Sequence, residues 1–245
     1  MSFKWYFKNL ESTDYKKEME GIMRKRDGMS LWKLIEYTLQ MSNVLIHENV
    51  SQEKLSKIRD HFNRREYEKV IIGLMETIDL ETKIQLDFMP DNFILDELKK
   101  MSGYEWALKS ASMMGLSFSV FSYKKPAYVL VGDEMPCFRS RIFQEHVTQM
   151  RIGESVKFES FESFVTIVMH ELMHIVLFSR QHPLRRNELA TDIGILLAGY
   201  GDIAKLGRIG QSARFGYLNC KEFAFVHRLV ELIKFFKRKK KIKNN

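Results

Sequence analysis

The sequence predicts an α+β protein in which a helix-rich N-terminal part precedes a small antiparallel sheet over a helix with the motif HExxH. Apolar residues recur at helical spacing through the first 111 residues. Apolar and polar residues alternate at 116–120, as in a half-buried strand. A second strand is predicted at 127–131, so the two would form a hairpin. The HExxH motif, at residues 170–174, lies in a long apolar run. We expect three parts: a helical region at 1–111, a sheet-and-helix domain at 112–236 and a basic disordered tail at 237–245.

Four apolar stripes predict helices in the N-terminal part. They begin near Ser30, Ser51, Tyr67 and Asp91, and Ser30 is a candidate N-cap. A stripe repeated every three or four residues indicates one buried face for each helix. The apolar positions are Leu31, Leu34, Ile35 and Leu39; Leu55 and Ile58; the run from Tyr67 to Ile78; and Phe93, Ile94, Leu98 and Met101.

A β-hairpin is predicted just before the HExxH helix. Leu116 to Val120 and Ala127 to Val131 are the two strands, and Lys124-Lys125-Pro126 is the turn. A sheet placed over that helix would have an edge strand able to hold an extended peptide by main-chain hydrogen bonds.

The HExxH motif predicts a metal site. His170 and His174 are four residues apart, so both rings lie on one face of a helix and can reach the same ion. Glu171 lies beside them, where it could take a proton from a water on a bound zinc ion. The helix is apolar nearly all round, so it is expected to be buried, where unpaired ionisable groups are costly. The alternative is a pair of hydrogen-bonded core histidines.

A third ligand is predicted at Glu188, which would complete a His, His, Glu set and leave a fourth position for water. Asp192 is one helical turn further on, where it could accept the free ring N–H of His170 or His174. A solvated helix face is the alternative for this pair of acids, but the apolar residues after Asp192 indicate a buried helix. We expect one Zn²⁺ per chain.

These residues resemble the pattern of the gluzincin metallopeptidases, in which HExxH is followed by a downstream helix with NExxxD. Asn187, Glu188 and Asp192 match the second motif. The resemblance covers roughly residues 160–232, extends to a group of uncharacterised bacterial HExxH proteins, and implies a minimal zincin-like domain. The metzincin variant is disfavoured because Leu177 and Arg180 stand where its glycine and third histidine would fall. His182 is the rival ligand nearby, in a His-Pro sequence typical of a loop.

Several glycines break the chain after the second motif, and a closing helix is predicted from about 221 to 236. Zinc peptidases commonly use a Tyr, His or Arg to stabilise the oxyanion of the tetrahedral intermediate. Tyr217, Arg214 and His227 are the candidates in this part of the chain, and each has a plain structural alternative.

Composition places the chain among cytoplasmic enzymes. Its 245 residues are 45% apolar, and its two cysteines, Cys137 and Cys220, match no metal-binding or disulfide spacing. The first residues lack the apolar run of a signal peptide, and we expect no membrane span.

The net charge of +8 is concentrated near the C-terminus, where Lys237 to Lys243 is strongly basic. Attachment to nucleic acid or to an anionic membrane is one interpretation, and a solvated tail is the other. Specific nucleic-acid binding is disfavoured because no zinc finger or helix-turn-helix spacing is present.

The sequence therefore predicts a gluzincin-like zinc metallopeptidase that acts on a protein or peptide substrate, with Glu171 as general base. Two alternatives come from other classes. One is a non-catalytic regulatory or protein-interaction module that binds a regulatory protein partner. The other is a nucleic-acid-associated protein guided by the basic tail.

Overall fold

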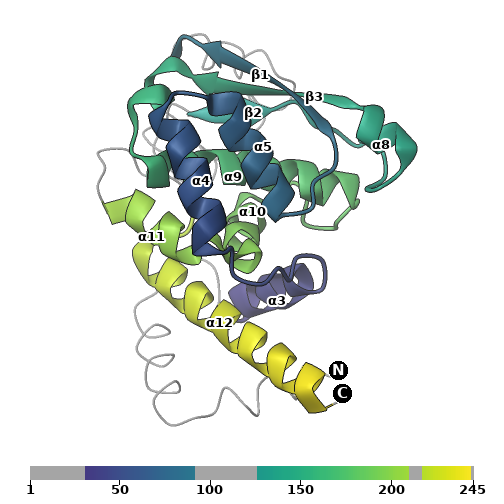
Figure 1. Cartoon of the computed structure of the whole chain (residues 1–245). Coiled ribbons are helices and arrows are strands. Elements are labelled where there is room, and N and C mark those ends of the chain that lie inside the picture. The colour runs from purple at the N-terminus through teal and green to yellow at the C-terminus, as the bar shows by residue number, and fades with distance from the viewer. Residues whose placement is uncertain (1–30, 92–125, 210–216, 244–245) are drawn as a thin grey trace, which may run out of the picture. The chain divides into compact units, whose positions relative to one another are not determined.

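The computed structural model describes residues 31–91, 126–209 and 217–243 and has an α+β architecture with a small mixed sheet (Figure 1). The chain forms two compact units. One contains residues 53–182, and the other combines residues 1–52 with 183–245. The predicted boundary at residues 111 and 112 lies outside the described residues, as do the strand predicted at 116–120 and most of the helix predicted from Asp91.

The unit of residues 53–182 holds the sheet and the HExxH helix. Its elements are α4 (Gln52–Asn63), α5 (Tyr67–Thr77), β1 (Lys83–Met89), β2 (Ala127–Val129), α8 (Arg141–Glu145), β3 (Val147–Gly153), the 3₁₀ helix η2 (Glu154–Phe158) and α9 (Phe161–Ser179). Helices α4 and α5 confirm the helices predicted near Ser51 and from Tyr67. Both α5 and β2 contact α9, so the HExxH helix is covered by a helix and by the sheet (Figure 1).

The three strands have the order β1-β3-β2. β3 pairs parallel with β1 and antiparallel with β2. The predicted sheet was purely antiparallel, and this was wrong because β1 and β3 were not recognised as strands. The described part of the predicted hairpin corresponds to β2, which is two residues shorter than expected.

Alternation in β3 explains why one face of the sheet packs inward. Thr148, Met150 and Ile152 are buried, and the residues between them are more exposed. Side chains on a strand alternate between faces, so these three residues face the core.

Helix α9 is the core of this unit. By length and composition alone it could cross a membrane. In the structure, 83% of the most apolar stretch of α9 is buried inside the protein, as in the core helix of a globular domain.

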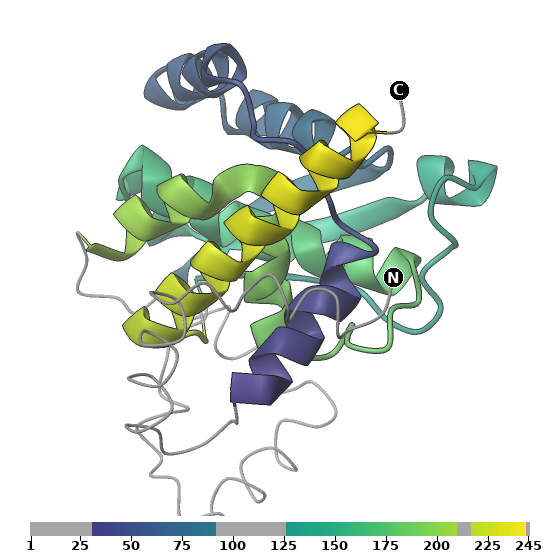
Figure 2. The same ribbon diagram turned by 90° about the horizontal axis from the view of Figure 1, so that it is seen from below.

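The second unit is helical in its described residues: α3 (Leu31–Ser42), α10 (Glu188–Ile195), the π-helical turn η3 (Leu196–Tyr200), α11 (Gly201–Ile209) and α12 (Cys220–Lys243). Helix α3 confirms the helix predicted after Ser30. It contacts both α10 and α12, and Figure 2 shows it alongside α12.

A glycine shapes the bend after α10. Gly199 has a φ of 95°, and a Cβ there would lie 3.2 Å from Glu48 O and from Val50 N. Glycine suits this position because other residues rarely adopt such a φ and because the backbone of 48–50 comes so close.

The closing helix continues further than predicted. We expected it to end near Phe236, but α12 extends to Lys243 through the basic segment. Lysine and arginine are good helix formers, and positive charge is favourable near the C-terminal end of a helix. Lys234 is buried, and its Nζ lies 3.3 Å from Asn49 Oδ1 and 3.7 Å from a Glu231 oxygen. Burial lowers the pKa of Lys234.

Candidate metal centre

Helix α9 presents its two histidines from one face. The hydroxyl of Ser160 caps the helix by accepting the N–H of Ser163 at 3.2 Å. Every residue of α9 is buried except Glu162, His170 and His174. The rings of His170 and His174 are 4.9 Å apart between centroids and lie edge to face. Beyond its first turn, the two histidines are therefore the partly open positions of an otherwise buried helix.

Glu188 stands at the start of α10. The preceding residue, Asn187, is the N-cap, and its side-chain oxygen accepts the N–H of Ala190 at 3.1 Å. The amide nitrogen of Asn187 donates to the hydroxyl of Tyr37 of α3 at 3.4 Å. This cap fixes the first turn of α10 and with it the position of Glu188. Asn187 was predicted only as part of a motif and not as a cap, although Asn directly before a helix is a strong capping signal.

His170, His174 and Glu188 form a group that could hold a metal ion. Each offers one ligand atom, and these atoms all lie within 4.8 Å of one another. All three side chains are partly exposed. The structure thus brings together the three residues predicted as ligands, whereas His182, the rival, is buried and is not in the group. Two imidazoles and a carboxylate suit zinc and several other divalent transition metals.

Glu171 is a nearly buried carboxylate beside this group. Its residue is 7% exposed, and it follows His170 directly on α9. Within the described part of the chain, no hydrogen bond or ion pair is formed by its side chain. A carboxylate in such surroundings is costly unless it has a functional partner.

Asp192 is used by the backbone of a neighbouring turn. It is 3% exposed, and its Oδ2 accepts the N–H of Tyr217 at 2.6 Å and that of Leu218 at 3.1 Å. A carboxylate has capacity for further donors, so the predicted hydrogen bond from a histidine ring stays a prediction. The two bonds tie the segment of Tyr217 to α10, one turn beyond Glu188.

The three residues predicted to stabilise the oxyanion differ in exposure and in their contacts. Tyr217 is half exposed. His227, on α12, is packed against Gly201, where an added Cβ would collide with the ring, and its Nε2 lies 4.0 Å from Asp202 Oδ1. Arg214 lies outside the described residues. His227 therefore has a structural role, whatever else it does.

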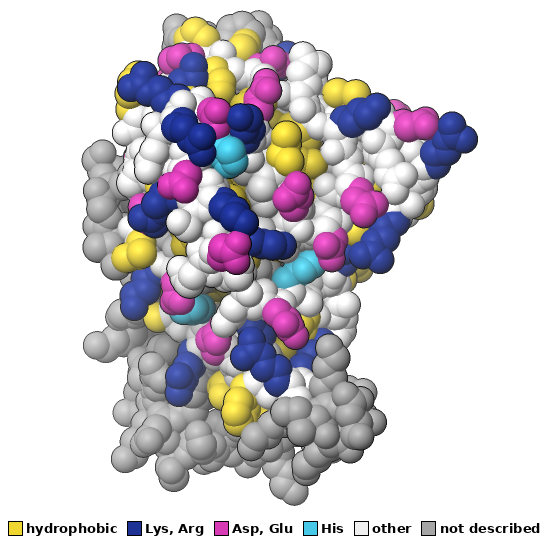
Figure 3. All heavy atoms as spheres, in the orientation of Figure 1, with side chains coloured by type: hydrophobic (Ala, Val, Ile, Leu, Met, Phe, Trp, Pro, Cys, Tyr) yellow, Lys and Arg dark blue, Asp and Glu magenta, His cyan; other side chains and the backbone are white. Residues whose placement is uncertain are grey.

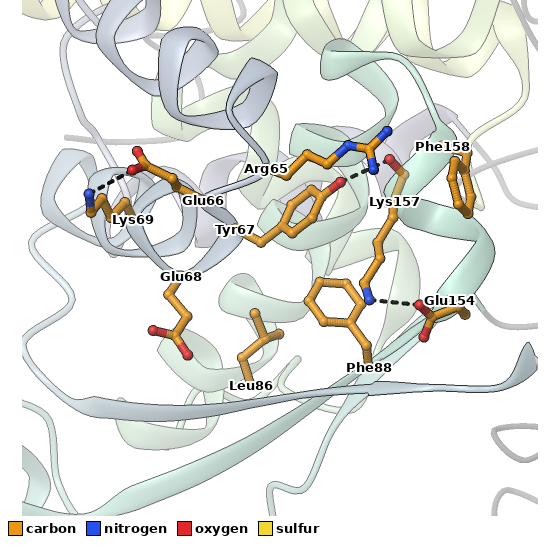
Figure 4. A pocket seen from close by; sticks show the side chains of 10 residues that line it. All are labelled: Arg65, Glu66, Tyr67, Glu68, Lys69, Leu86, Phe88, Glu154, Lys157 and Phe158. Carbon is orange, nitrogen blue, oxygen red and sulfur yellow. Dashed lines mark hydrogen bonds and ion pairs between the residues drawn. The ribbon is translucent and has the colours of Figure 1, made fainter.

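A separate pocket of about 690 Å³, which we call the edge pocket, opens between α5, β1 and η2 (Figure 4). It contains neither the three grouped residues nor Glu171. Its walls include Tyr67, Phe88, Lys157 and Phe158, none of which was predicted from the sequence as a site residue. These residues come from three distant segments, so no local pattern could have marked them.

No protein-family model, curated protein or solved structure significantly matches this chain.

Proposed function

We propose that this protein is a zinc-dependent, gluzincin-like peptidase that hydrolyses peptide bonds in a protein or peptide substrate. The observation that carries the proposal is the group of His170, His174 and Glu188 together with the nearly buried carboxylate of Glu171. A site built only to hold a metal would need no additional acid at that position.

The donor set favours zinc as the resident ion, with one ion per chain. Three protein ligands of the types His, His and Glu are typical of catalytic zinc, because a fourth position is left for water. When bound, zinc lowers the pKa of its water enough to supply a nucleophile near neutral pH.

Glu171 is the proposed general base. It would accept a proton from the attacking water and deliver that proton to the leaving amine. Its burial supports this role, because a carboxylate shielded from bulk water interacts more strongly with nearby charge than an exposed one does.

We infer that β2 and the HExxH helix form a zincin-like substrate site. β2 is antiparallel to β3, contacts α9 and forms an edge of the described sheet. An extended peptide beside β2 could be held by main-chain hydrogen bonds. Tyr217, Arg214 and His227 remain our candidates for stabilising the oxyanion, and Asp192 supports Tyr217 by holding its backbone N–H. We place the activity in the cytoplasm because the cysteine usage suits a reducing compartment.

The deciding experiment compares the wild-type chain with Glu171→Gln. The substitution removes the base without removing a ligand, so the zinc content should stay near one per chain. Hydrolysis should fall by about a hundredfold to ten-thousandfold. New peptide ends are counted by mass spectrometry in cells expressing each form. Glu162→Gln is the matched control, because Glu162 is on the same helix but pairs with Arg59 at 2.7 Å.

The two outcomes separate the candidate functions. Peptide ends found with wild type and Glu162→Gln, but not with Glu171→Gln, support the peptidase. Identical peptide ends for all three forms, with the same partner proteins bound, would instead support the non-catalytic interaction module.

A further inference from the structure

The edge pocket has a fixed rim. The hydroxyl of Tyr67 donates to Lys157 O at 3.0 Å, which joins α5 to η2. The ammonium of Lys157 pairs with Glu154 at 2.7 Å and lies 4.2 Å from the centre of the Phe88 ring. The rings of Tyr67 and Phe88 meet edge to face at 5.2 Å. Because these contacts already hold the walls in place, a ligand would bind with little ordering cost.

One side of the edge pocket is β1, an edge strand of the sheet formed by the described residues. β1 pairs with β3, and in the described sheet it has no strand on its other side. An edge strand presents a row of main-chain N–H and C=O groups that can pair with another chain. Such an edge suits an extended peptide better than a compact ligand.

The inner face of β1 is only partly covered. Leu86 and Phe88 line the pocket and are half-buried, whereas their register partners on β3, Met150 and Ile152, are fully buried. Phe158, also in the lining, is 76% exposed. An apolar side chain entering the pocket would cover this surface and would be stabilised by the area removed from water.

Two unpaired charges of opposite sign flank this apolar surface. Figure 4 shows Glu68 near Leu86 at one end and Arg65 with Phe158 at the other. Among the residues the structure describes, neither Arg65 nor Glu68 has a side-chain ion pair. The other charged side chains in the lining form ion pairs: Glu66 pairs with Lys69 at 2.9 Å, and Lys157 pairs with Glu154. Over α4 and α5 as a whole, Figure 3 shows acidic and basic side chains interspersed.

We propose that β1 and the edge pocket bind an extended peptide segment of a partner protein. Its main chain would pair with the open edge of β1. An aromatic side chain would fill the apolar centre, with an acidic side chain at Arg65 and a basic one at Glu68. This inference does not rest on the proposed peptidase activity, because it involves neither the metal group nor Glu171.

Strand geometry sets the spacing of the bound segment. Side chains on the same face of a strand are two residues and about 6.6 Å apart. In an extended peptide, consecutive pocket-facing residues are therefore separated by single residues. Lys-Thr-Phe-Thr-Asp and its reverse, Asp-Thr-Phe-Thr-Lys, are the simplest sequences that fit, one for each direction of pairing along β1.

The experiment uses fluorescein-labelled forms of these two peptides and the full chain. Fluorescence anisotropy should show that one of the two orders binds more tightly. Replacing Phe by Ala in that peptide should weaken binding by about tenfold or more. In an NMR titration, the amide signals that shift should be those of 83–89 and of the pocket lining. Mass spectrometry of the recovered peptide verifies that it stays intact.

Charge exchange gives the sharpest test. Arg65→Glu should weaken binding of the preferred peptide by about threefold to tenfold, because it replaces an exposed ion pair by a contact between like charges. A peptide with Lys in place of Asp should recover that loss on the Arg65→Glu protein. Lys205→Glu, the same charge change at an exposed residue of α11 outside the pocket, should leave the affinity unchanged.

Pairing with β1 has its own control. N-methylation of alternate peptide amides removes donors from one edge of the peptide strand at a time, so one methylated set should abolish binding and the other should not. The proposal is overturned if neither order binds, or if binding is insensitive to peptide order and to Arg65→Glu.

Discussion

Glu188 is the residue whose substitution best tests the metal group. Glu188→Gln should strongly reduce zinc retention, because a neutral amide is a poor replacement for a carboxylate ligand. Asp192→Asn should weaken zinc affinity by only roughly tenfold to a hundredfold, as for a residue that orients a ligand. Zinc per chain is measured by elemental analysis after dialysis.

His170→Ala and His174→Ala should likewise leave little zinc, and His182→Ala should retain it, because His182 is outside the group. If His182→Ala released the metal while Glu188→Gln kept it, the gluzincin-type ligand set would be wrong.

Glu66 provides a pH-dependent prediction at the residue scale. Hydrogen bonds from His61 and Lys69 lower the pKa of Glu66 to about 2. A carboxyl group with a lowered pKa stabilises the folded state above its ordinary pKa of 4.5, and this contribution is lost as the pH falls toward 2. The Glu66 carboxyl should titrate with a midpoint near 2 by NMR. His61→Ala should raise the midpoint, since the His61 contact is the largest cause. An unchanged midpoint would show that the 2.6 Å contact between His61 and Glu66 is not formed in solution.

At the scale of elements, the bend after α10 depends on Gly199. Gly199→Ala forces a side chain into left-handed backbone and against the chain at 48–50. The conformation alone should cost about 1–2 kcal/mol, and the 3.2 Å contacts should add to it. Urea denaturation followed by circular dichroism measures the change in the free energy of unfolding.

Gly132→Ala is the matched control for this prediction. A Cβ at Gly132 meets nothing within 4 Å, so the free energy of unfolding should change by less than about 0.5 kcal/mol. Equal stabilities for the two variants would contradict the close approach at Gly199.

At the scale of the whole molecule, metal binding should raise thermal stability. An ion bound only by the folded chain stabilises it by about 2.7 kcal/mol when its free concentration is a hundred times Kd. For a chain of this size, that corresponds to a rise in Tm of roughly 5–10 °C. Differential scanning calorimetry with zinc and after chelation measures the difference. His170→Ala should show the same Tm in both conditions; a zinc-dependent rise of equal size in that variant would place the ion elsewhere.

Local patterns accounted for several of the helices and for the candidate ligands, but not for α11, which lies where glycines were expected to break the chain. Helices α3, α4 and α5 followed from apolar residues at helical spacing, since a helix forms its hydrogen bonds within one segment. The same spacing put His170 and His174 on one face, and an acid at the start of a second helix identified Glu188. Nothing beyond a single segment or a short motif was needed for these predictions.

Only the tertiary structure decided the strand pairing, the Asp192 contacts and the edge pocket. β1 and β3 are far apart in the sequence, and strand pairing depends on which segments meet in space. Asp192 meets the N–H groups of Tyr217 and Leu218 for the same reason. The sequence by itself determined which residues could bind a metal and which segments could be helical, because both properties arise within a few turns of chain. Which distant groups lie together is set by the packing of the whole chain, so it cannot be predicted from any single segment.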